Sequence, residues 1–403
     1  MSDVKSLRAG LALGLAFFSG MLSSSLPTPL YPLYRDIFNF SASQIMIVFG
    51  VYAVGVLLTL CITSRLRIRS EHYSRAIYAG LGCVTLSSLL MMFAVNLEML
   101  AIARFITGAG SGILMAYVNR SLIRLFSTDK SNLAALTASA ALVLGQALGP
   151  VISGNAIQFN LFELRLPFLV LLLTSVTAVV AVFFCAAVIN QPVQQGTPFV
   201  QKSGAGRKSE PAMKHVFVSC SAIFLSWAMA STLMSQGPTL ARSYFGVTDP
   251  QVISYTLSAF LAVAGITQFA MRGADHHFSL SMGIFAQLGA LLIACASSLT
   301  AQTGLLLMAV LLEGFAYGAI LVGAATIVNR MAVKSGKSQL VNLLYIMGYI
   351  GNWLPMILSL SMDHFSVKTA LLVYLCLCIF VAALITLFCR LARRSSKASA
   401  PPT

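Results

Sequence analysis

The feature that most constrains this chain is a series of twelve apolar stretches. Each holds roughly 20 residues, enough for a helix rising 1.5 Å per residue to cross a hydrocarbon layer about 30 Å thick. The chain is 58% hydrophobic and 9% charged, whereas a soluble domain is usually about 25% charged. A soluble fold is therefore excluded. The expected spans are 8–30, 44–64, 75–95, 97–119, 133–157, 166–189, 215–236, 251–271, 280–300, 303–327, 338–361 and 368–389.

One long polar segment divides the spans six and six. Residues 191–214 are rich in Gln, Pro, Ser, Gly and Lys, and such a segment buries too little apolar surface to fold alone. We predict a six-helix bundle over 1–190, a cytoplasmic linker over 191–214 and a second six-helix bundle over 215–403. No sizeable soluble domain remains.

The two halves also repeat one another. "SASQI" at 41–45 and "TDPQV" at 248–252 share a capping-box pattern, which predicts the start of the second helix in each half. Four further matches occur in the same order, at offsets of 205 to 211 residues: Arg65 with Arg272, Pro27-Thr28 with Pro238-Thr239, Asn119-Arg120 with Asn329-Arg330, and Pro150 with Pro355. A duplicated six-helix unit of this kind is the plan of two-halved secondary transporters. The expected fold class is an all-α integral membrane protein with two pseudo-symmetric bundles.

Positive charge gathers on one side of the predicted bilayer. If both termini share a side, that side holds 21 of the 26 Lys and Arg residues, the other side holds four, and Arg104 lies inside a span. Because cytoplasmic loops collect Lys and Arg, both termini are expected in the cytoplasm. The net charge of +15 is then explained by the topology of the chain. Its expected counter-charge is the anionic lipid headgroups and not nucleic acid. We expect a multi-pass plasma membrane protein of the bacterial inner membrane.

The eight cysteines lie in or at the ends of the apolar spans, where they behave as small hydrophobes. They predict neither a metal site nor a disulfide framework. No cofactor is expected.

Two stretches resemble motifs of the major facilitator superfamily. "LAIARFITGAGSG" at 100–112 is similar to motif B, with Arg104, Gly108 and Gly110 in place and Thr107 where Gln is usual. "GQALGPVISG" at 145–154 resembles motif C, with Ser153 for the first of the closing glycines. The matching motif C residues are Gly145, Gly149, Pro150 and Gly154.

Two other features depart from that family's pattern. "SRLRIRSEHYSR" at 64–75 keeps the basic residues of motif A but lacks its central aspartate, which puts the usual charge latch in doubt. "RGADHH" at 272–277 is a partial second copy that retains Asp275, and its short cluster of acidic and histidine side chains is expected to be solvated and not metal-binding. The first helix lacks the acid that many proton-coupled drug exporters carry there.

The resemblance covers essentially the whole chain and implies a twelve-helix transporter that works by alternating access. Similarity to the motif C branch, the drug:proton antiporters, implies efflux of small amphipathic, drug-like compounds in exchange for protons. The alternative is a proton-coupled importer or exporter of one specific metabolite, which the altered motif A favours. The expected partners are a small-molecule substrate, protons and the lipid bilayer, with no nucleic acid, and we expect a monomer. A membrane-embedded enzyme or receptor would need a catalytic dyad or a sensory domain, and the sequence shows neither.

Glu313 and Arg104 are the candidate proton-coupling residues. Glu313 lies about 15 Å into the tenth span, and intramembrane acids usually face a bundle interior and carry function. The alternative is a permanently paired or protonated glutamate that only holds helices together. The motif B arginine is implicated in proton coupling in the family, and the alternative for Arg104 is satisfaction by backbone carbonyls. The repeat places Arg104 opposite Gly314, so an ion pair with Glu313 is also conceivable.

Other residues have packing or lining roles. The motif C glycines predict close helix packing, and Pro150 predicts a bend in the fifth span. Tyr31 and Tyr34 are expected in the interfacial aromatic belt, with an exit path as the alternative. Further polar and aromatic residues within spans are candidates for lining a central cavity: Tyr117, Gln146, Trp227, Gln236, Tyr317, Asn342, Tyr345, Asn352 and Trp353.

Overall fold

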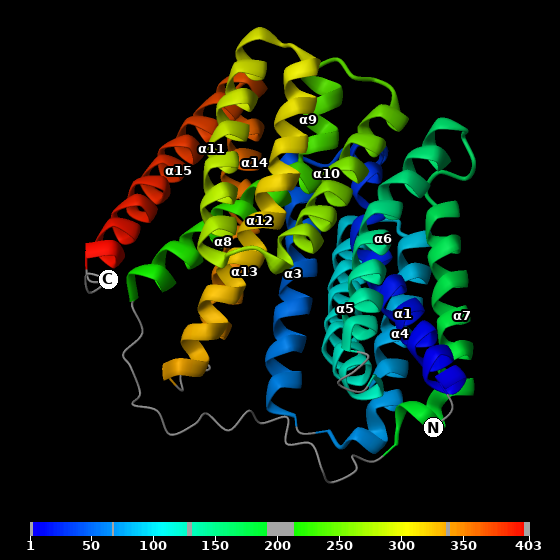
Figure 1. The fold of residues 1–403 in the computed structure, drawn as a ribbon. Coiled ribbons are helices and arrows are strands. Elements are labelled where there is room, and N and C mark those ends of the chain that lie inside the picture. Colours follow the sequence, from blue (N-terminus) through cyan, green and yellow to red (C-terminus); the bar gives the residue numbers. More distant parts are fainter. Residues whose placement is uncertain (1–2, 67, 127–130, 192–212, 336–338, 399–403) are drawn as a thin grey trace. The chain divides into compact units, whose positions relative to one another are not determined.

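The fold of the described residues is helical throughout (Figure 1). The computed structural model describes residues 3–66, 68–126, 131–191, 213–335 and 339–398. The α-helices of the first half are α1 (Asp3–Ser25), α2 (Tyr31–Phe38), α3 (Ala42–Arg65), α4 (Tyr73–Met92), α5 (Leu97–Leu125), α6 (Ser131–Gln158) and α7 (Leu166–Ile189). Those of the second half are α8 (Met213–Ser235), α9 (Gly237–Ser243), α10 (Pro250–Ala270), α11 (His276–Thr300), α12 (Thr303–Ser335), α13 (Gln339–Gly351), α14 (Pro355–His364) and α15 (Val367–Ala398).

The twelve predicted spans are confirmed, because the described residues hold twelve helical segments that are long and apolar enough to cross a membrane. The sixth span matches its predicted bounds, 166–189, at both ends. The first is longer than predicted, at Val4–Phe38, and the tenth continues past residue 327 to Ala332.

Two of the spans are broken by proline. The first is interrupted between α1 and α2 by the 3-10 turn Thr28–Leu30, in a stretch that holds Pro27, Pro29 and Pro32. The eleventh breaks between α13 and α14, and Pro355 starts α14 within its first turn. A proline at a helix start loses no hydrogen bond, whereas Pro150 lies inside α6. The two prolines matched by the repeat therefore have different local settings.

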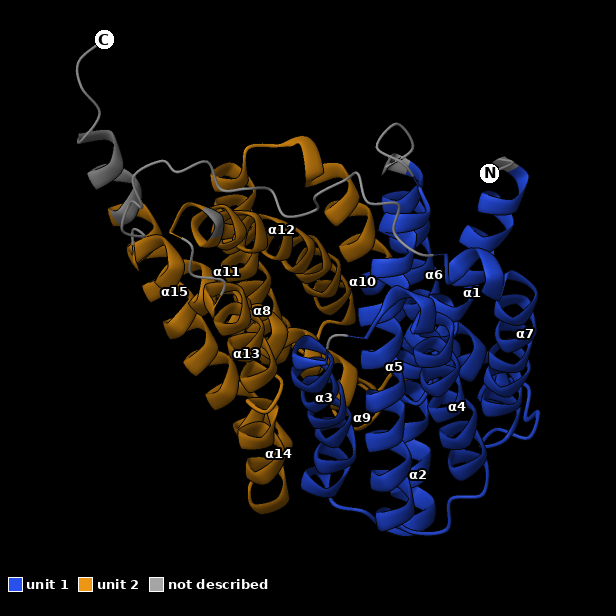
Figure 2. Ribbon diagram, turned by 90° about the horizontal axis from the view of Figure 1, so that it is seen from below, with its two compact units in different colours: residues 1–197, 248–261 blue, residues 198–247, 262–403 orange. Residues whose placement is uncertain are grey.

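The chain forms two compact units, coloured separately in Figure 2. Unit 1 comprises Met1–Thr197 and Thr248–Leu261, and unit 2 comprises Pro198–Val247 and Ala262–Thr403. The first half of α10 thus packs with unit 1, and its second half with unit 2. The predicted linker 191–214 falls almost entirely outside the described residues, so the predicted domain boundaries stay a prediction.

Within unit 1, α1 is the central helix. It packs against α5, α6 and α7, while α5 also packs against α3 and α4. The buried side chains Leu13, Phe17 and Leu22 place the core along α1.

Within unit 2, α8 has the corresponding central place. It packs against α12, α13 and α15, and α11 packs along α12. Buried Ile223 and Leu225 of α8 and Leu344 of α13 belong to its core.

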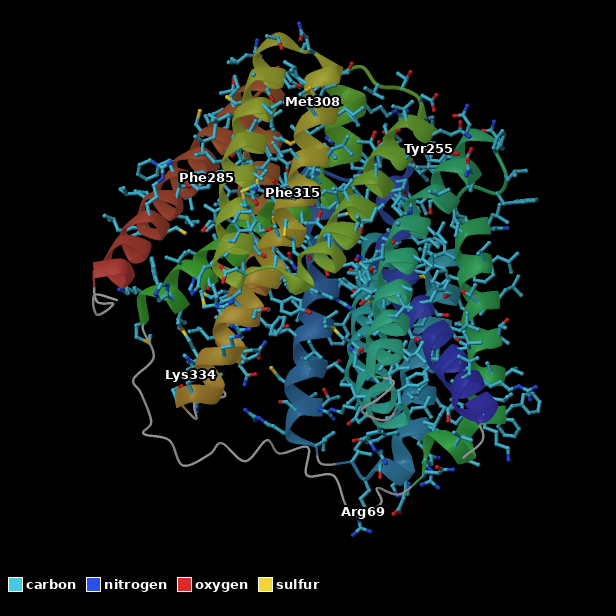
Figure 3. All side chains as sticks on the ribbon, in the orientation of Figure 1. Arg69, Tyr255, Phe285, Met308, Phe315 and Lys334 are labelled. Atoms are coloured by element: carbon cyan, nitrogen blue, oxygen red, sulfur yellow. The ribbon has the colours of Figure 1, made fainter. Side chains whose placement is uncertain are left out.

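The outward faces carry large apolar side chains. Phe285 on α11 is 42% exposed and Met308 on α12 is 57% exposed (Figure 3). In water such exposure would be costly, but hydrocarbon is as apolar as these side chains. The surface agrees with a protein surrounded by lipid.

The two expected capping boxes have different outcomes. At α3 the box is confirmed: Ser41 Oγ accepts from the Gln44 backbone N–H at 3.2 Å, and the Gln44 side chain accepts from the Ser41 N–H at 2.8 Å. At α10 the prediction from Thr248 is wrong. There Asp249 Oδ1 accepts from the backbone N–H of Gln251 at 2.8 Å. Aspartate caps as well as a hydroxyl does, so the neighbouring residue takes the role.

Candidate functional site: buried charges and close helix contacts

Glu313 lies in the interior of unit 2, on the face of α12 that packs against α11. Its side chain is buried, with 4% exposed, and the Gln287 side-chain amide Nε2 on α11 donates a hydrogen bond to Glu313 Oε2. Glu313 Oε1 and Gln287 Oε1 have no hydrogen-bond partner among the described residues. Two buried oxygen acceptors therefore lack a donor on this pair.

The described side chains that interact with Glu313 are neutral. Tyr374 and Cys378 on α15 lie within electrostatic reach of its carboxyl group. The hydroxyl groups of Tyr374 and of Thr232 on α8 lie 2.8 Å apart and are hydrogen bonded. Helices α8, α11, α12 and α15 thus build a buried polar cluster around one carboxyl group.

Arg104 is fully buried in unit 1, where it lies at the broken end of α1. Arg104 Nη1 donates to the backbone carbonyls of Ser24 at 3.2 Å and Ser23 at 3.4 Å. These carbonyls belong to the last turn of α1, where helix carbonyls lack partners and the helix dipole favours a cation. The guanidinium carbon also lies 4.6 Å from the ring centroid of Tyr52 on α3. Hydrogen bonding to backbone carbonyls is the alternative role that the sequence predicts for Arg104, and Nη1 is bonded in that way.

The other edge of the Arg104 guanidinium has no hydrogen-bond partner among the described residues. Its Nε and Nη2 atoms are buried, as are the hydroxyl oxygens of Tyr31 and Tyr34. Both tyrosines are 1% exposed and lie within electrostatic reach of Arg104. The prediction that they form an interfacial belt is wrong, because the break at Thr28–Leu30 turns α2 inward over the core of unit 1.

Arg104 and Glu313 have separate settings. Arg104 belongs to unit 1 and Glu313 to unit 2, and each has hydrogen-bond partners within its own unit. An ion pair between them stays a prediction.

The motif B glycines lie where α5 meets its neighbours. A Cβ on Gly108 would collide with the backbone oxygen of Tyr52 on α3, and one on Gly110 would collide with the backbone oxygen of Gly80 on α4. Helix backbones approach this closely only where side chains are absent. Thr107, which replaces the usual Gln, donates its hydroxyl to the Ala103 carbonyl at 2.8 Å within the same helix.

The motif C residues dock α6 onto the end of α1. A Cβ on Gly145 would meet the Phe18 backbone oxygen, and one on Gly149 would meet Ser25 and the backbone of Leu26. Four residues further along α6, Ser153 Oγ donates to the Leu26 carbonyl at 2.6 Å.

The end of α6 also contacts the first half of α10, within unit 1. Asn155 Oδ1 accepts from Gln251 Nε2 at 2.9 Å and from the Tyr255 hydroxyl at 3.0 Å. A Cβ on Gly154 would collide with Ser254. Sequence reasoning missed this polar contact, because Asn155 and Gln251 lie near helix ends, where amides are common.

The predicted cavity residues fall into different environments. Tyr117 and Gln236 are buried inside their own units, and the Gln236 amide donates to Ser359 at 2.9 Å. Trp227 packs edge-on against Tyr349, with ring centroids 5.0 Å apart. Asn342 is exposed, and the remaining candidates are partly buried: Gln146, Tyr317, Tyr345, Asn352 and Trp353. Their role in lining a cavity stays a prediction.

Gln287 is the functional candidate that sequence reasoning missed. It is 2% exposed and supplies the direct hydrogen-bond partner of Glu313. The available signal was an amide near the middle of the ninth span, one of few polar side chains there. Its pairing with Glu313 depends on how α11 and α12 are rotated against each other, which periodicity does not give.

The comparisons with known proteins agree with this architecture. The sequence profile described as Major Facilitator Superfamily matches residues 13–352. The MFS-type transporter YcnB of Bacillus subtilis (strain 168) is 28% identical over 172 residues, which span 41% of this chain and 36% of that protein.

Two solved structures share the fold over nearly the full length of both chains. A bacterial homologue of the human lysosomal transporter Spinster, in an inward-facing and unoccupied conformation, has a TM-score of 0.72 at 15% identity, with 100% of each chain covered. The POT family transporter PepTSo has a TM-score of 0.75 at 11% identity, with 99% of each chain covered. The profile match, the twelve spans and the shared fold lead to one conclusion: this chain belongs to the Major Facilitator Superfamily and is a membrane transporter.

Proposed function

We propose that this transporter couples the movement of protons to the efflux of small, amphipathic organic compounds by alternating access. The observation that carries the proton coupling is the Glu313–Gln287 pair. Of the acidic side chains whose burial is described, Glu313 is the one that is buried. A single buried carboxyl group inside a helix bundle is a natural carrier for one proton.

Two oxygen acceptors of the pair lack a donor, Glu313 Oε1 and Gln287 Oε1, and a proton on Glu313 would supply one. With Oε2 accepting from Gln287, a proton on Oε1 turns one unsatisfied acceptor into a donor. The ionised form, by contrast, leaves a buried negative charge beside a neutral amide, which is costly. Alternating access would let the proton leave when the surroundings of Glu313 change.

Arg104 enters the proposal as the second coupling candidate. Its positive charge is held at the end of α1, on carbonyl oxygens and an aromatic face. A change in the end of α1 would therefore change the environment of this charge. Movement of the first span would in this way alter the surroundings of the Arg104 charge in the fourth span.

The direction of transport rests on the resemblance to motif C. The contacts of Gly145 and Gly149 with α1 support a tight pairing of the first and fifth spans. A proton-coupled transporter of one metabolite is the second candidate, favoured by the missing motif A aspartate in residues 64–75. On either reading we place the protein as a monomer in the bacterial inner membrane, with both termini in the cytoplasm.

A susceptibility screen is the first experiment, because no substrate is identified. Strains that lack or overproduce the full chain are grown with a panel of drugs and metabolites. Overproduction is expected to raise tolerance to several amphipathic compounds. Growth that depends on a single nutrient would overturn efflux and support the second candidate.

Proton coupling is then tested in everted vesicles with a compound from that screen. Glu313→Gln is expected to abolish proton movement driven by the compound, because glutamine cannot carry the proton. Glu98→Gln is the matched control, since Glu98 is an exposed acid in the first turn of α5. Normal coupling in Glu313→Gln would overturn the assignment of this residue.

A further inference from the structure

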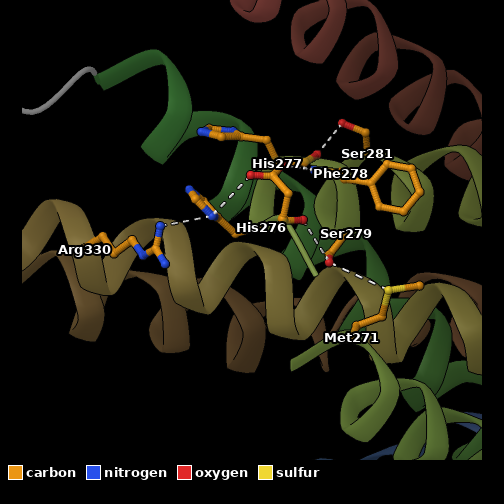
Figure 4. Close-up of polar contacts among 8 residues, drawn as sticks. Met271, His276, His277, Phe278, Ser279, Ser281 and Arg330 are labelled. Carbon is orange, nitrogen blue, oxygen red and sulfur yellow. Dashed lines mark hydrogen bonds and ion pairs between the residues drawn. The ribbon is translucent and has the colours of Figure 1, made fainter. Parts of the chain in front are cut away.

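Four basic side chains form a row at one end of unit 2, where α8 and α11 begin and α12 approaches its end. The ring centroid of His215 on α8 lies 5.2 Å from that of His277 on α11. The His277 and His276 centroids are 4.6 Å apart, and Arg330 Nη1 on α12 lies 3.2 Å from His276 Nδ1. Figure 4 shows the part of this row from Arg330 through His276 to His277. We call His215, His276, His277 and Arg330 the basic row.

Among the described residues, Asp275 is the acid in contact with the basic row, at His276, and one of its oxygens is already hydrogen bonded. Asp275 is the N-cap of α11, and its Oδ1 accepts from the Phe278 backbone N–H at 2.8 Å. That hydrogen bond, with the nearby His276 and His277, lowers the pKa of the Asp275 carboxyl, which keeps it ionised at neutral pH. The Asp275 carboxylate therefore faces His276 and His277, two of the four members of the basic row.

Further basic residues lie close along the chain. Lys214 precedes His215, Arg272 precedes the start of α11, and Lys334 follows Arg330 by one turn of α12. A neutral contact lies further along α11, where Ser281 Oγ is 3.5 Å from Cys389 Sγ on α15. Among the described residues around the basic row, basic side chains therefore outnumber acidic ones.

The Nδ1 atom of His276 has one neighbour that is a hydrogen-bond donor and one that is an acceptor. Arg330 Nη1, at 3.2 Å, is a donor, so Nδ1 accepts from it only when it carries no proton. Asp275 Oδ2, at 3.7 Å, is an acceptor, so a protonated Nδ1 is attracted to it and repelled by Arg330. The two roles exclude one another. Protonation of His276 therefore releases an N–H of Arg330 for another acceptor.

The basic row lies at a membrane boundary. Candidate spans begin at Met213 and His276, and another ends at Ala332. The charged headgroups of lipids lie at this level, and basic pockets between helices are known to hold them.

Below the basic row, α11 presents apolar side chains that suit acyl chains. Phe278, Met282 and Phe285 recur at helical spacing and are 50%, 40% and 42% exposed. A free phosphate would not contact this apolar surface, whereas the acyl chains of a lipid would pack against it.

We propose that the basic row binds the phosphate of an anionic lipid headgroup, and that protonation of His276 tightens the binding by freeing Arg330. The phosphate oxygens would accept from Arg330 and from the imidazole N–H groups, as charge-assisted hydrogen bonds. On the predicted topology this site faces the cytoplasmic leaflet. Binding of an anionic lipid to unit 2 would then depend on the pH of the cytoplasm.

The experiment measures binding of a fluorescent phosphatidylglycerol to the full chain in phosphatidylcholine nanodiscs. Measurements are made at about pH 5.5 and about pH 8, on either side of the range in which histidine changes charge. Binding is expected to be tighter at the lower pH. Arg330→Gln is expected to weaken it by about fivefold, the value of one basic residue at an anionic surface. Equal binding of a zwitterionic probe lipid would overturn the anionic site.

Single variants separate the His276 switch from a general gain of charge. His276→Gln holds an acceptor next to Arg330 at every pH, so it is expected to reduce the pH dependence more than His215→Gln does. His72→Gln is the matched control, because His72 is an exposed histidine in unit 1. An equal effect of His215→Gln and His276→Gln would overturn the switch. Displacement of the lipid by inorganic phosphate alone, at concentrations matched to the lipid, would overturn lipid as the ligand.

Discussion

Gln287 donates its side-chain amide to Glu313 between α11 and α12, so the buried acid of unit 2 is held by a neutral partner. An acid held in this way can change its protonation without breaking an ion pair. The paired amide thus fits a group that exchanges a proton better than a buried arginine or lysine would.

Removal of Gln287 is expected to destabilise the protein. Gln287→Leu leaves a buried Glu313 without its donor, and an unsatisfied buried polar group costs about 1 to 3 kcal/mol. Thermal unfolding of the purified chain in detergent measures this as a lower Tm. The double variant Gln287→Leu/Glu313→Leu is expected to recover part of the loss, since both polar groups are gone. Additive losses would show that the two side chains are not coupled.

A side chain at Gly149 is expected to force α1 and α6 apart. Gly149→Val would bring a branched side chain against Ser25 and the Leu26 backbone, and overpacking usually costs about 1 to 3 kcal/mol. The yield of folded protein and its Tm should both fall. Gly82→Val is the control, because a Cβ at Gly82 meets nothing within 4 Å. Equal tolerance of valine at both positions would contradict the close contact.

Replacement of Arg104 is expected to loosen the end of α1. Arg104→Met removes the donor to Ser23 and Ser24, and a hydrogen bond to a charged group is worth about 1.5 to 3 kcal/mol. Hydrogen exchange should speed up at the amides of Leu26 and Leu30, which lie at the break.

Two further variants complete this test. Arg104→Lys is expected to give an intermediate rate, because it keeps the charge but not the fork of donors. Arg165→Met, at an exposed arginine, serves as the control. Unchanged exchange at Leu26 in Arg104→Met would show that the end of α1 holds its shape without this residue.

Asp275 is expected to contribute a pH-dependent part of the stability of α11. Its pKa is lowered in the folded protein, chiefly by the hydrogen bond from Phe278. The contribution is therefore complete above the unfolded pKa, about 3.9, and is lost as the pH falls through the lower folded value.

The variants at this cap separate its hydrogen bond from its charge. Asp275→Ala should cost about 0.5 to 2 kcal/mol at neutral pH, the usual value of an N-cap. Asp275→Asn should keep most of the cap and lose the acid-range dependence, as measured by Tm against pH. A full loss in Asp275→Asn would show that the charge, and not the cap, stabilises α11.

Much of the fold could be predicted because membrane spans follow from length and apolarity alone. The sixth span is bounded by Arg165 and Asn190, polar residues that stop a hydrophobic run clearly. The first and eleventh spans were harder, because a proline such as Pro355 predicts a break without predicting how the chain continues after it. The capping box at Ser41 was readable from local sequence, whereas at α10 two adjacent cap residues competed for one role.

Less of the site could be predicted. The positions of Glu313 and Arg104 inside the bilayer stood out, since charges there are rare. Their partners did not, because Gln287 and the Ser24 carbonyl are brought to them by helix rotation and by the break in α1. Tyr31 shows the same limit: its aromatic ring suits an interface, but the chain turns it into the core.

The hydrogen bond from Ser153 to Leu26 has a consequence for how the fifth span can move. Glycine, usual at this motif position, gives two helices a smooth contact along which they can slide or turn. The Ser153 hydroxyl, bonded to the Leu26 carbonyl, instead fixes how far α6 is shifted along α1. We therefore expect these two helices to move together.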